Sequence, residues 1–294
     1  MARGASTLSL ALPPFTKAVK YLVIANVGIF AAMLLMKGLA PGLYSYITFA
    51  AALVPAAVVH GWVWQLVSYS FFHSGVGHVL FNMLALWMFG AQFEMEWGTR
   101  KFLEYYFWCV IGAALTTIAV GYIGLALAAA SPGTPLFNVL ASIAGTATIG
   151  ASGGVYGLLI AFGLIYGNRE IMIFPFPFLI KAKYMVTIWI LLAVFGALGG
   201  QGGVAYFAHL GGALFGWFYL RFLPRHGLQV AASESYYGVR NRYYRWKRRQ
   251  AAKKFEVYMN KHRREEFFDE YGNFRGPLKD DDKSEGEGRG PWVN

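Results

Sequence analysis

The sequence predicts an all-α, polytopic membrane protein built as a bundle of six transmembrane helices. Only 14% of its 294 residues are charged, and 56% are hydrophobic. Of the 15 acidic residues, 4 lie before residue 221. Several apolar runs between Lys20 and Leu223 approach the roughly 20 residues that cross a hydrocarbon core about 30 Å thick. Most of the chain therefore cannot form the surface of a soluble protein and must face lipid.

Apolar runs separated by breaks define the six predicted spans. They cover residues 20–36, 78–95, 102–124, 151–167, 184–198 and 204–223. The first span follows Lys17 and Lys20 and has no small-residue cleavage site before Lys37. We therefore expect a retained helix there and not a removed signal peptide.

Two further apolar stretches are interpreted as something other than spans. The stretch 136–149 follows a break that contains proline and glycine and is only 14 residues long, so we expect a re-entrant or interfacial segment. The segment 38–77 is interrupted by Pro41 and Pro55 and is rich in aromatic residues, which suit the headgroup region. It is predicted to be a structured loop in the membrane interface.

The distribution of basic residues predicts the orientation, because Lys and Arg in short loops are retained on the cytoplasmic side. The loops at 38–77, 125–150 and 199–203 contain neither residue. Six spans with the N- and C-termini in the cytoplasm account for this asymmetry, whereas a seventh span at 136–149 would place the basic tail outside. We expect an integral, multi-pass protein of a bacterial inner (plasma) membrane.

Composition divides the chain into three parts. We predict an N-terminal cytoplasmic segment at 1–16, a membrane domain at 17–224 and a basic, partly disordered cytoplasmic tail at 225–294. Within the tail, residues 240–264 hold 11 Lys+Arg and one acid, Glu256. Anionic lipid headgroups are the expected partner of this segment. Nucleic acid, which its interleaved aromatic residues would also suit, is not expected because the tail follows a membrane core.

No cofactor and no metal are expected. Cys109 is the only cysteine, so neither an internal disulfide nor a Cys-rich metal site can form. The carboxylates before residue 221 fall on the predicted cytoplasmic side, away from His78 and His209, and no zinc-protease motif is present. A histidine-carboxylate metal site is therefore not predicted.

Polar and ionisable groups inside a membrane are costly unless they are paired, so those within the spans need a reason. Three spans carry such groups in their first one or two turns. The groups are His78 with Asn82, Ser152 in Gly150-Ala-Ser-Gly-Gly154, and His209 in Ala208-His-Leu-Gly-Gly212. All three spans are predicted to run from outside to inside, so these groups share a depth to within several ångströms. One pocket beneath the outer face could hold them all.

The residue types in this predicted pocket indicate hydrolytic chemistry. A serine is a weak nucleophile without a neighbouring base, and His209 is the only histidine in the last three spans. If the site is hydrolytic, Ser152 is therefore the nucleophile and His209 the general base. His78 and Asn82 lie four residues apart on one helical face and are candidates to stabilise an oxyanion. The backbone N–H of Ser152, near a helix N-terminus, is a third candidate.

Small residues let two helix backbones approach closely. Two pairs of glycines stand four residues apart, and so on one helical face: Gly153 with Gly157, and Gly212 with Gly216. Contact between their faces would bring Ser152 within reach of His209, and Tyr156, one turn after the serine, could pack against the imidazole ring. Taken singly, each motif fits ordinary helix packing or a structural histidine. Their order and common depth together favour a catalytic site.

These three motifs resemble the signatures of the rhomboid proteases, in the same order and on the same spans, and the resemblance covers residues 17–224. It implies a six-helix fold, a Ser-His dyad without an acidic member, and intramembrane cleavage of single-pass transmembrane substrates near their outer end. It matches Ser152 to the nucleophile and His209 to the base. It also matches His78 and Asn82 to the side chains that stabilise the oxyanion.

One departure from the family and two rival functions stay open. The family often shows Trp-Arg in the first outer loop, whereas this chain has Trp64-Gln65, so the resemblance leaves the anchoring of this loop open. A catalytically silent rhomboid-like protein that binds and escorts membrane helices would keep the fold without needing Ser152 or His209. A small-solute transporter would use the same polar cavity, but the sequence shows no duplicated halves.

Overall fold

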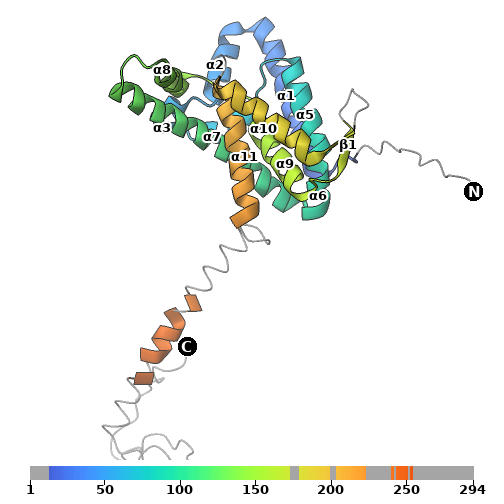
Figure 1. The fold of residues 1–294 in the computed structure, drawn as a ribbon, viewed down its shortest axis with the longest axis vertical. Helices are drawn as coiled ribbons and strands as arrows, with labels where there is room; N and C mark the ends of the chain where they lie inside the picture. The colour runs from blue at the N-terminus through green and yellow to red at the C-terminus, as the bar shows by residue number, and fades with distance from the viewer. Residues whose placement is uncertain are drawn as a thin grey trace, which may run out of the picture. The chain divides into compact units, whose positions relative to one another are not determined.

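The chain divides into two compact units, Met1–Leu228 and Gln229–Asn294. The computed structural model describes residues 13–172, 179–198 and 203–222 of the first unit, and residues 240–241, 243–250 and 252–253 of the second. The described part of the first unit is a bundle of helices (Figure 1).

Long helices make up most of this unit. They are α1 (Lys17–Leu39), α7 (Thr99–Ala130), α9 (Ser152–Ile165), α10 (Ala182–Leu198) and α11 (Gly203–Phe222). Another long helix is continuous from α5 (Val76–Ala85) through a π-helical turn, η2 (Leu86–Gly90), to α6 (Ala91–Trp97). Each predicted span overlaps one of these long helices.

Short elements connect the long helices. They are α2 (Pro41–Ala51), α3 (Pro55–Val59), α4 (Gln65–Ser68), η1 (Tyr69–Phe71), α8 (Pro135–Ser142) and η3 (Ile143–Gly145). An antiparallel hairpin of β1 (Glu170–Met172) and β2 (Leu179–Lys181) lies between α9 and α10. The predicted all-α class is confirmed, with this hairpin as a small addition.

Among the described residues, three helices are long and apolar enough to cross a membrane by themselves: α1, the α5–α6 helix and α7. Helix α9 has 14 residues and is therefore only about 21 Å long. The count of six spans accordingly stays a prediction.

Helices α7, α9 and α11 pack closely because glycines let their backbones meet. A Cβ atom on Gly212 of α11 would lie 2.0 Å from the carbonyl oxygen of Gly153 in α9. One turn further, a Cβ on Gly216 would lie 3.1 Å from the Cα of Gly157. The two faces that carry the paired glycines therefore touch, and no larger residue fits between them.

Large aromatic side chains fill the space beside this contact. Phe93, Phe102, Tyr105 and Tyr106 are each at most 1% exposed. The hydroxyl of Tyr105 donates to the carbonyl oxygen of Gly157 at 2.6 Å, which satisfies its polar end. Because buried polar atoms need partners, the ring can fill the core without an unpaired hydroxyl.

Glu94 in α6 joins the beginnings of two long helices. Its carboxylate accepts hydrogen bonds from the backbone N–H groups of Ala18 and Val19 at 2.8 and 3.0 Å. It also accepts from the hydroxyls of Thr16 and Thr99. The carboxylate thus satisfies orphan N–H groups in the first turn of α1, where negative charge is also favoured by the helix dipole.

Many large apolar side chains lie on the surface of the bundle. On α10, Tyr184, Ile188, Trp189 and Phe195 are each at least 47% exposed, and on α5 Phe81 is 71% exposed. A soluble protein would be prone to aggregate with such surfaces, whereas lipid tails solvate them. This exposure agrees with an integral membrane protein.

The structure differs from the sequence-based expectations in two places. Helix α7 continues past the predicted end at residue 124 to Ala130, because the intervening alanines and leucines favour helix until Ser131-Pro132. The stretch 136–149 contains the short helix α8, which packs along α7 (Figure 1), and its interpretation as a re-entrant or interfacial segment stays a prediction. The β hairpin was not predicted, because three-residue strands are too short to show an alternating pattern.

Candidate active site

Ser152 and His209 lie in hydrogen-bonding contact. Ser152 is the first residue of α9, and His209 stands in the second turn of α11. The Oγ of Ser152 and the Nε2 of His209 are 2.8 Å apart. The backbone contact between Gly153 and Gly212 sets this approach, because it brings α9 and α11 together beside the two side chains. Both side chains are half-buried, so they are shielded without being sealed off.

Two tyrosines hold the imidazole ring of His209. The ring of Tyr156 stacks on it with centroids 4.3 Å apart and planes 6° from parallel. Tyr206 meets it edge-on at 5.9 Å and 90°. The Nδ1 atom of His209 is buried and has no hydrogen-bond partner in the described part of the chain. Aromatic packing therefore orients the ring, in place of the acidic residue of a Ser-His-Asp triad.

His78 projects from α5 towards the residues just before the nucleophile. A Cβ atom on Gly150 would lie 2.7 Å from the Nε2 of His78 and 3.6 Å from the Oγ of Ser152. On the other side of the ring, the Nδ1 atom accepts the backbone N–H of Ser74 at 3.4 Å. With Nδ1 as acceptor, a neutral His78 carries its proton on Nε2 and presents a donor towards this space.

Asn82 lies one turn further along α5 and is 7% exposed. Its Nδ2 donates to the carbonyl oxygen of His78 at 2.9 Å. An asparagine amide has two N–H donors, so this bond fixes the side chain and leaves the second donor for another acceptor.

The backbone that leads into Ser152 is held by the segment before α5. Leu53 and Thr148 exchange two backbone hydrogen bonds of 2.9 Å each. The N–H of Gly150 donates to the carbonyl oxygen of Tyr69 at 2.9 Å. Gly150 has a φ of 129°, a conformation that residues with a side chain rarely adopt. The nucleophile thus follows a backbone that is fixed on both sides of Ile149.

Gln65 anchors the same outer segment. Its side chain is fully buried, and its Oε1 accepts the N–H of Val54 at 2.9 Å. Its Nε2 lies 3.2 and 3.3 Å from the carbonyl oxygens of Phe49 and Ala50. The sequence left the anchoring at Trp64-Gln65 open, and in the structure the glutamine amide both donates to and accepts from the loop backbone.

His73 is a neighbour of the site, although it belongs to the segment 38–77 that was predicted to be an interfacial loop. It is 8% exposed, and its ring lies edge-on to that of His78 with centroids 5.0 Å apart. Its Nε2 lies 3.5 Å from the backbone N of Ala151. Burial, and then the proximity of His78, lower the pKa of His73 to about 4, so the ring is neutral near pH 7. No spacing pattern distinguished His73 from an interfacial histidine.

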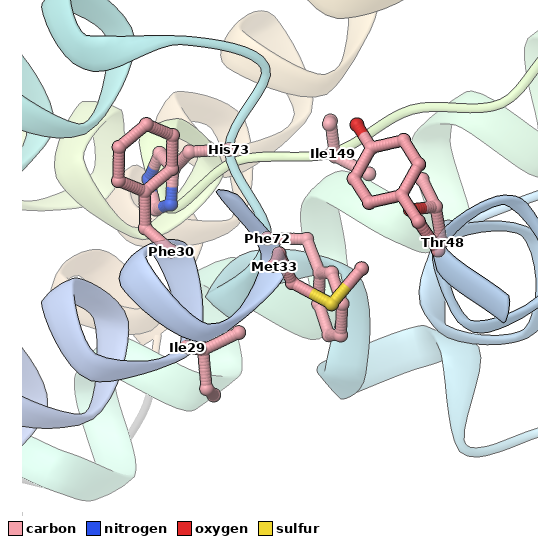
Figure 2. Close-up of a pocket in the computed structure, with 8 residues that line it drawn as sticks. Ile29, Phe30, Met33, Thr48, Phe72, His73 and Ile149 are labelled. Carbon is pink, nitrogen blue, oxygen red and sulfur yellow. The ribbon is translucent and has the colours of Figure 1, made fainter. Parts of the chain in front are cut away.

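A small, mostly apolar pocket borders the site on one side (Figure 2). Its walls come from α1, α2, the residues before α5 and the residue Ile149 before α9, as Phe30, Met33, Thr48, Phe72, His73 and Ile149 show in Figure 2. Neither Ser152 nor His209 lines it. The pocket therefore adjoins the backbone before the nucleophile and is separate from the Ser152–His209 contact.

Within the described residues, no group of three or more His, Cys, Asp or Glu side chains is arranged to hold a metal ion. Cys109 is a free, buried thiol beneath Gly157. The chemical groups gathered here are a hydroxyl, a neutral nitrogen base and several N–H donors. Such a set can perform acyl transfer.

Comparison with known proteins agrees with this arrangement. The model of the Rhomboid domain family matches residues 60–226, which is more than half of the chain. Rhomboid-like protein 19 of Arabidopsis thaliana is 29% identical over 183 residues, covering 59% of this chain and 53% of that protein. RHOMBOID-like protein 4 of the same plant is 33% identical over 167 residues, covering 56% and 36%.

A bacterial relative carries an activity in its name. Rhomboid protease AarA of Providencia stuartii is 28% identical over 174 residues, covering 58% of this chain and 59% of that protein. The chain spans about half the length, or less, of the two plant relatives above. Because relatives come from plants as well as bacteria, the likeness does not select a bacterial membrane, and that expectation stays a prediction. By its domain match, its fold and its apolar helices, the chain is an integral membrane protein of the rhomboid family.

Proposed function

We propose that this protein is an intramembrane serine endopeptidase in which Ser152 is the nucleophile and His209 the general base. The observation that carries the proposal is the 2.8 Å contact between the Oγ of Ser152 and the Nε2 of His209. A contact of this length lets the imidazole take the hydroxyl proton as the oxygen attacks a carbonyl carbon.

The reaction proceeds in two steps. In the first, the Oγ of Ser152 bonds to the carbonyl carbon of the scissile peptide, and His209 passes the proton it has taken to the leaving amine. In the second, a water molecule gives a proton to His209 and attacks the acyl-enzyme, which releases the new carboxyl group and restores the Ser152 hydroxyl. The stacked ring of Tyr156 supports His209 throughout, because it fixes the imidazole plane.

N–H donors near Ser152 stabilise the negative charge that develops on the carbonyl oxygen. The candidates are the Nε2–H of His78, the second amide donor of Asn82 and the backbone N–H of Ser152. His78 supports this role best, because its Nε2 lies beside Gly150 and the N–H of Ser74, which can only donate, favours Nδ1 as the acceptor. Removing one such donor typically lowers the rate by roughly 10²–10³-fold.

The substrates proposed for this site are single-pass transmembrane proteins, cleaved near the extracytoplasmic face. The loop charges support an orientation with both termini in the cytoplasm, which places the beginnings of α5, α9 and α11 on the outer side. Cysteine labelling from outside intact cells tests this: a cysteine at exposed Ser142 should react and one at Arg169 should not. The reverse pattern would contradict the orientation.

Cleavage of a reporter substrate with one transmembrane helix tests the proposal. We expect Ser152→Ala and His209→Ala each to lower the rate by at least about 1,000-fold while the protein still inserts and folds. Matched controls are Ser142→Ala and His60→Ala, which change exposed residues and should cleave like the wild type. Full cleavage by either site variant would remove the dyad. No cleavage by the wild type would favour the silent escort protein.

A further inference from the structure

The described residues of the second unit form a basic helix. Residues 240–241, 243–250 and 252–253 are helical, and all of those described are exposed. Between residues 240 and 254 the sequence contains eight Lys+Arg and no Asp or Glu. A helix that is charged to this degree, with one sign only, repels itself unless anions lie close by.

Aromatic rings are interspersed with these charges. Tyr243, Tyr244 and Trp246 are 54%, 46% and 56% exposed. Their rings form a cluster, in which Tyr243 lies 5.7 Å from Tyr244 and 6.2 Å from Trp246. The guanidinium group of Arg240 stands 5.9 Å from the centre of the Tyr244 ring. Tyrosine and tryptophan rings prefer the boundary between water and hydrocarbon, because one end of each ring is apolar and the other polar.

The place of this helix in the chain selects its partner. Phe222 ends α11, and Arg240 follows 18 residues later. A fully extended chain of that length spans at most about 60 Å. The basic segment is therefore tethered by a chain of limited length to a membrane-embedded unit, which raises the local concentration of headgroups around it. Nucleic acid would have to be recruited from solution.

We propose that residues 240–253 bind the surface of the membrane through anionic phospholipid headgroups, with the Tyr243-Tyr244-Trp246 cluster at the level of the headgroups. The Lys and Arg side chains supply attraction to the anionic surface, and each one near it strengthens binding roughly fivefold. This inference does not depend on the catalytic proposal, because none of its residues belongs to the Ser152 site.

The test uses the full chain in lipid nanodiscs with one fluorescent reporter. A polarity-sensitive maleimide dye is attached to Gln250→Cys, while the native Cys109 stays unlabelled because it is fully buried. The discs contain phosphatidylcholine alone or phosphatidylcholine mixed with phosphatidylglycerol. We expect a blue shift of the dye and quenching by spin-labelled lipid only in the mixed discs, and reversal of both by high salt.

Two triple variants make the test specific. The variant Lys247→Gln with Arg248→Gln and Arg249→Gln loses three charges. We expect it to bind the anionic surface about 100-fold more weakly, so that more anionic lipid is needed for the same blue shift. The matched control, Lys247→Arg with Arg248→Lys and Arg249→Lys, keeps the charge and should respond like the wild type. A third variant, Tyr243→Ser with Trp246→Ser, should keep the salt-sensitive response and lose most of the quenching by spin-labelled lipid.

Two results in the discs would overturn the proposal: no blue shift in mixed discs, or the same shift in phosphatidylcholine alone. A third is reversal of the shift by a short RNA, at an RNA concentration lower than the one that saturates a reference basic peptide. The last result would assign the helix to nucleic acid. Substrate cleavage is not a readout here, so a failure of this test leaves the proposed peptidase untouched, and the reverse also holds.

Discussion

The α9–α11 contact and the outer segment from Ala40 to Gly75 both position the residues around Ser152, but they do so by different means. Between α9 and α11 the backbones touch, and glycine makes this possible, as the 2.0 Å approach at Gly212 shows. The outer segment instead works through hydrogen bonds. The N–H of Val54 donates to the Oε1 of Gln65, Leu53 and Thr148 exchange two backbone bonds, and the N–H of Gly150 donates to the carbonyl oxygen of Tyr69.

The difference teaches which part of the site is sensitive to size and which to polarity. An added methyl group between two touching backbones has nowhere to go, because packed interiors cannot yield without moving a whole helix. A loop held by hydrogen bonds tolerates small changes in volume but not the loss of a buried donor or acceptor. A substitution that adds volume should therefore harm the α9–α11 contact more than the outer segment. A substitution that removes a buried polar group should do the reverse.

Among substitutions that test the two regions, the largest effect is expected for Gly212→Ala. Its new Cβ would meet the Gly153 carbonyl oxygen, so α11 must move away from α9 and carry His209 with it. We expect cleavage to fall at least about 100-fold, with a lower midpoint of thermal unfolding. Gly28→Ala is the matched control, because a Cβ there meets nothing within 4 Å. Wild-type cleavage by Gly212→Ala would refute the backbone contact.

Gly150→Ala should have the next largest effect, because it tests the point where the two regions meet. Alanine is strained at a φ of 129°, and its Cβ would collide with the Nε2 of His78. We expect kcat to fall about 100-fold, as when an oxyanion donor is lost, with a smaller change in KM. Gly145→Ala has open space and should behave like the wild type. A change confined to KM would argue against His78 as a donor.

Gln65→Leu probes polarity in the outer segment at nearly constant volume. It leaves the buried Val54 N–H without its acceptor and removes the Gln65 donor from the carbonyl oxygen of Phe49, while that of Ala50 keeps the Nε1–H of Trp64. Unfolding should therefore become easier by about 2 kcal/mol. We expect kcat/KM to fall about tenfold, since Leu53 and Thr148 lose their support. Gln92→Leu, at the half-buried Gln92 outside the outer segment, is the control for the added leucine. Equal unfolding curves for the two variants would show that Gln65 anchors nothing.

The smallest effect on chemistry is expected for Glu94→Gln, which lies outside both regions. The amide cannot accept all four hydrogen bonds that the carboxylate accepts, so stability should fall by about 1–3 kcal/mol. Cleavage per folded molecule should stay near the wild-type value. Glu96→Gln, at an exposed site, serves as the comparison for the charge change. A large loss of kcat without loss of stability would connect Glu94 to the site after all.

The contrast between the two regions also explains what the sequence could predict. Ser152, His209 and the glycines beside them stand at helical spacings, so their faces could be deduced from the period of an α-helix. Tyr156 followed from the same period. All of these residues lie on regular helices whose apolar runs were visible.

The outer segment resisted prediction because its contacts join residues with no regular spacing. Gln65 stands where the family often has arginine, and nothing in the sequence indicated that its amide would meet Val54, Phe49 and Ala50. His73 looked like one more interfacial histidine. The helices α2 to α4 were not predicted, because α3 and α4 have only five and four residues and α2 begins at Pro41 in a segment that prolines interrupt.

Labelling by a fluorophosphonate most directly tests the central claim that His209 activates Ser152 inside the membrane. The reagent needs no bound substrate, so its rate reports the reactivity of the hydroxyl alone. We predict that mass spectrometry will find the adduct on Ser152 of the wild type, and that His209→Ala will abolish it while His60→Ala leaves it intact. Equal labelling of wild type and His209→Ala, or an adduct on another serine, would contradict the account.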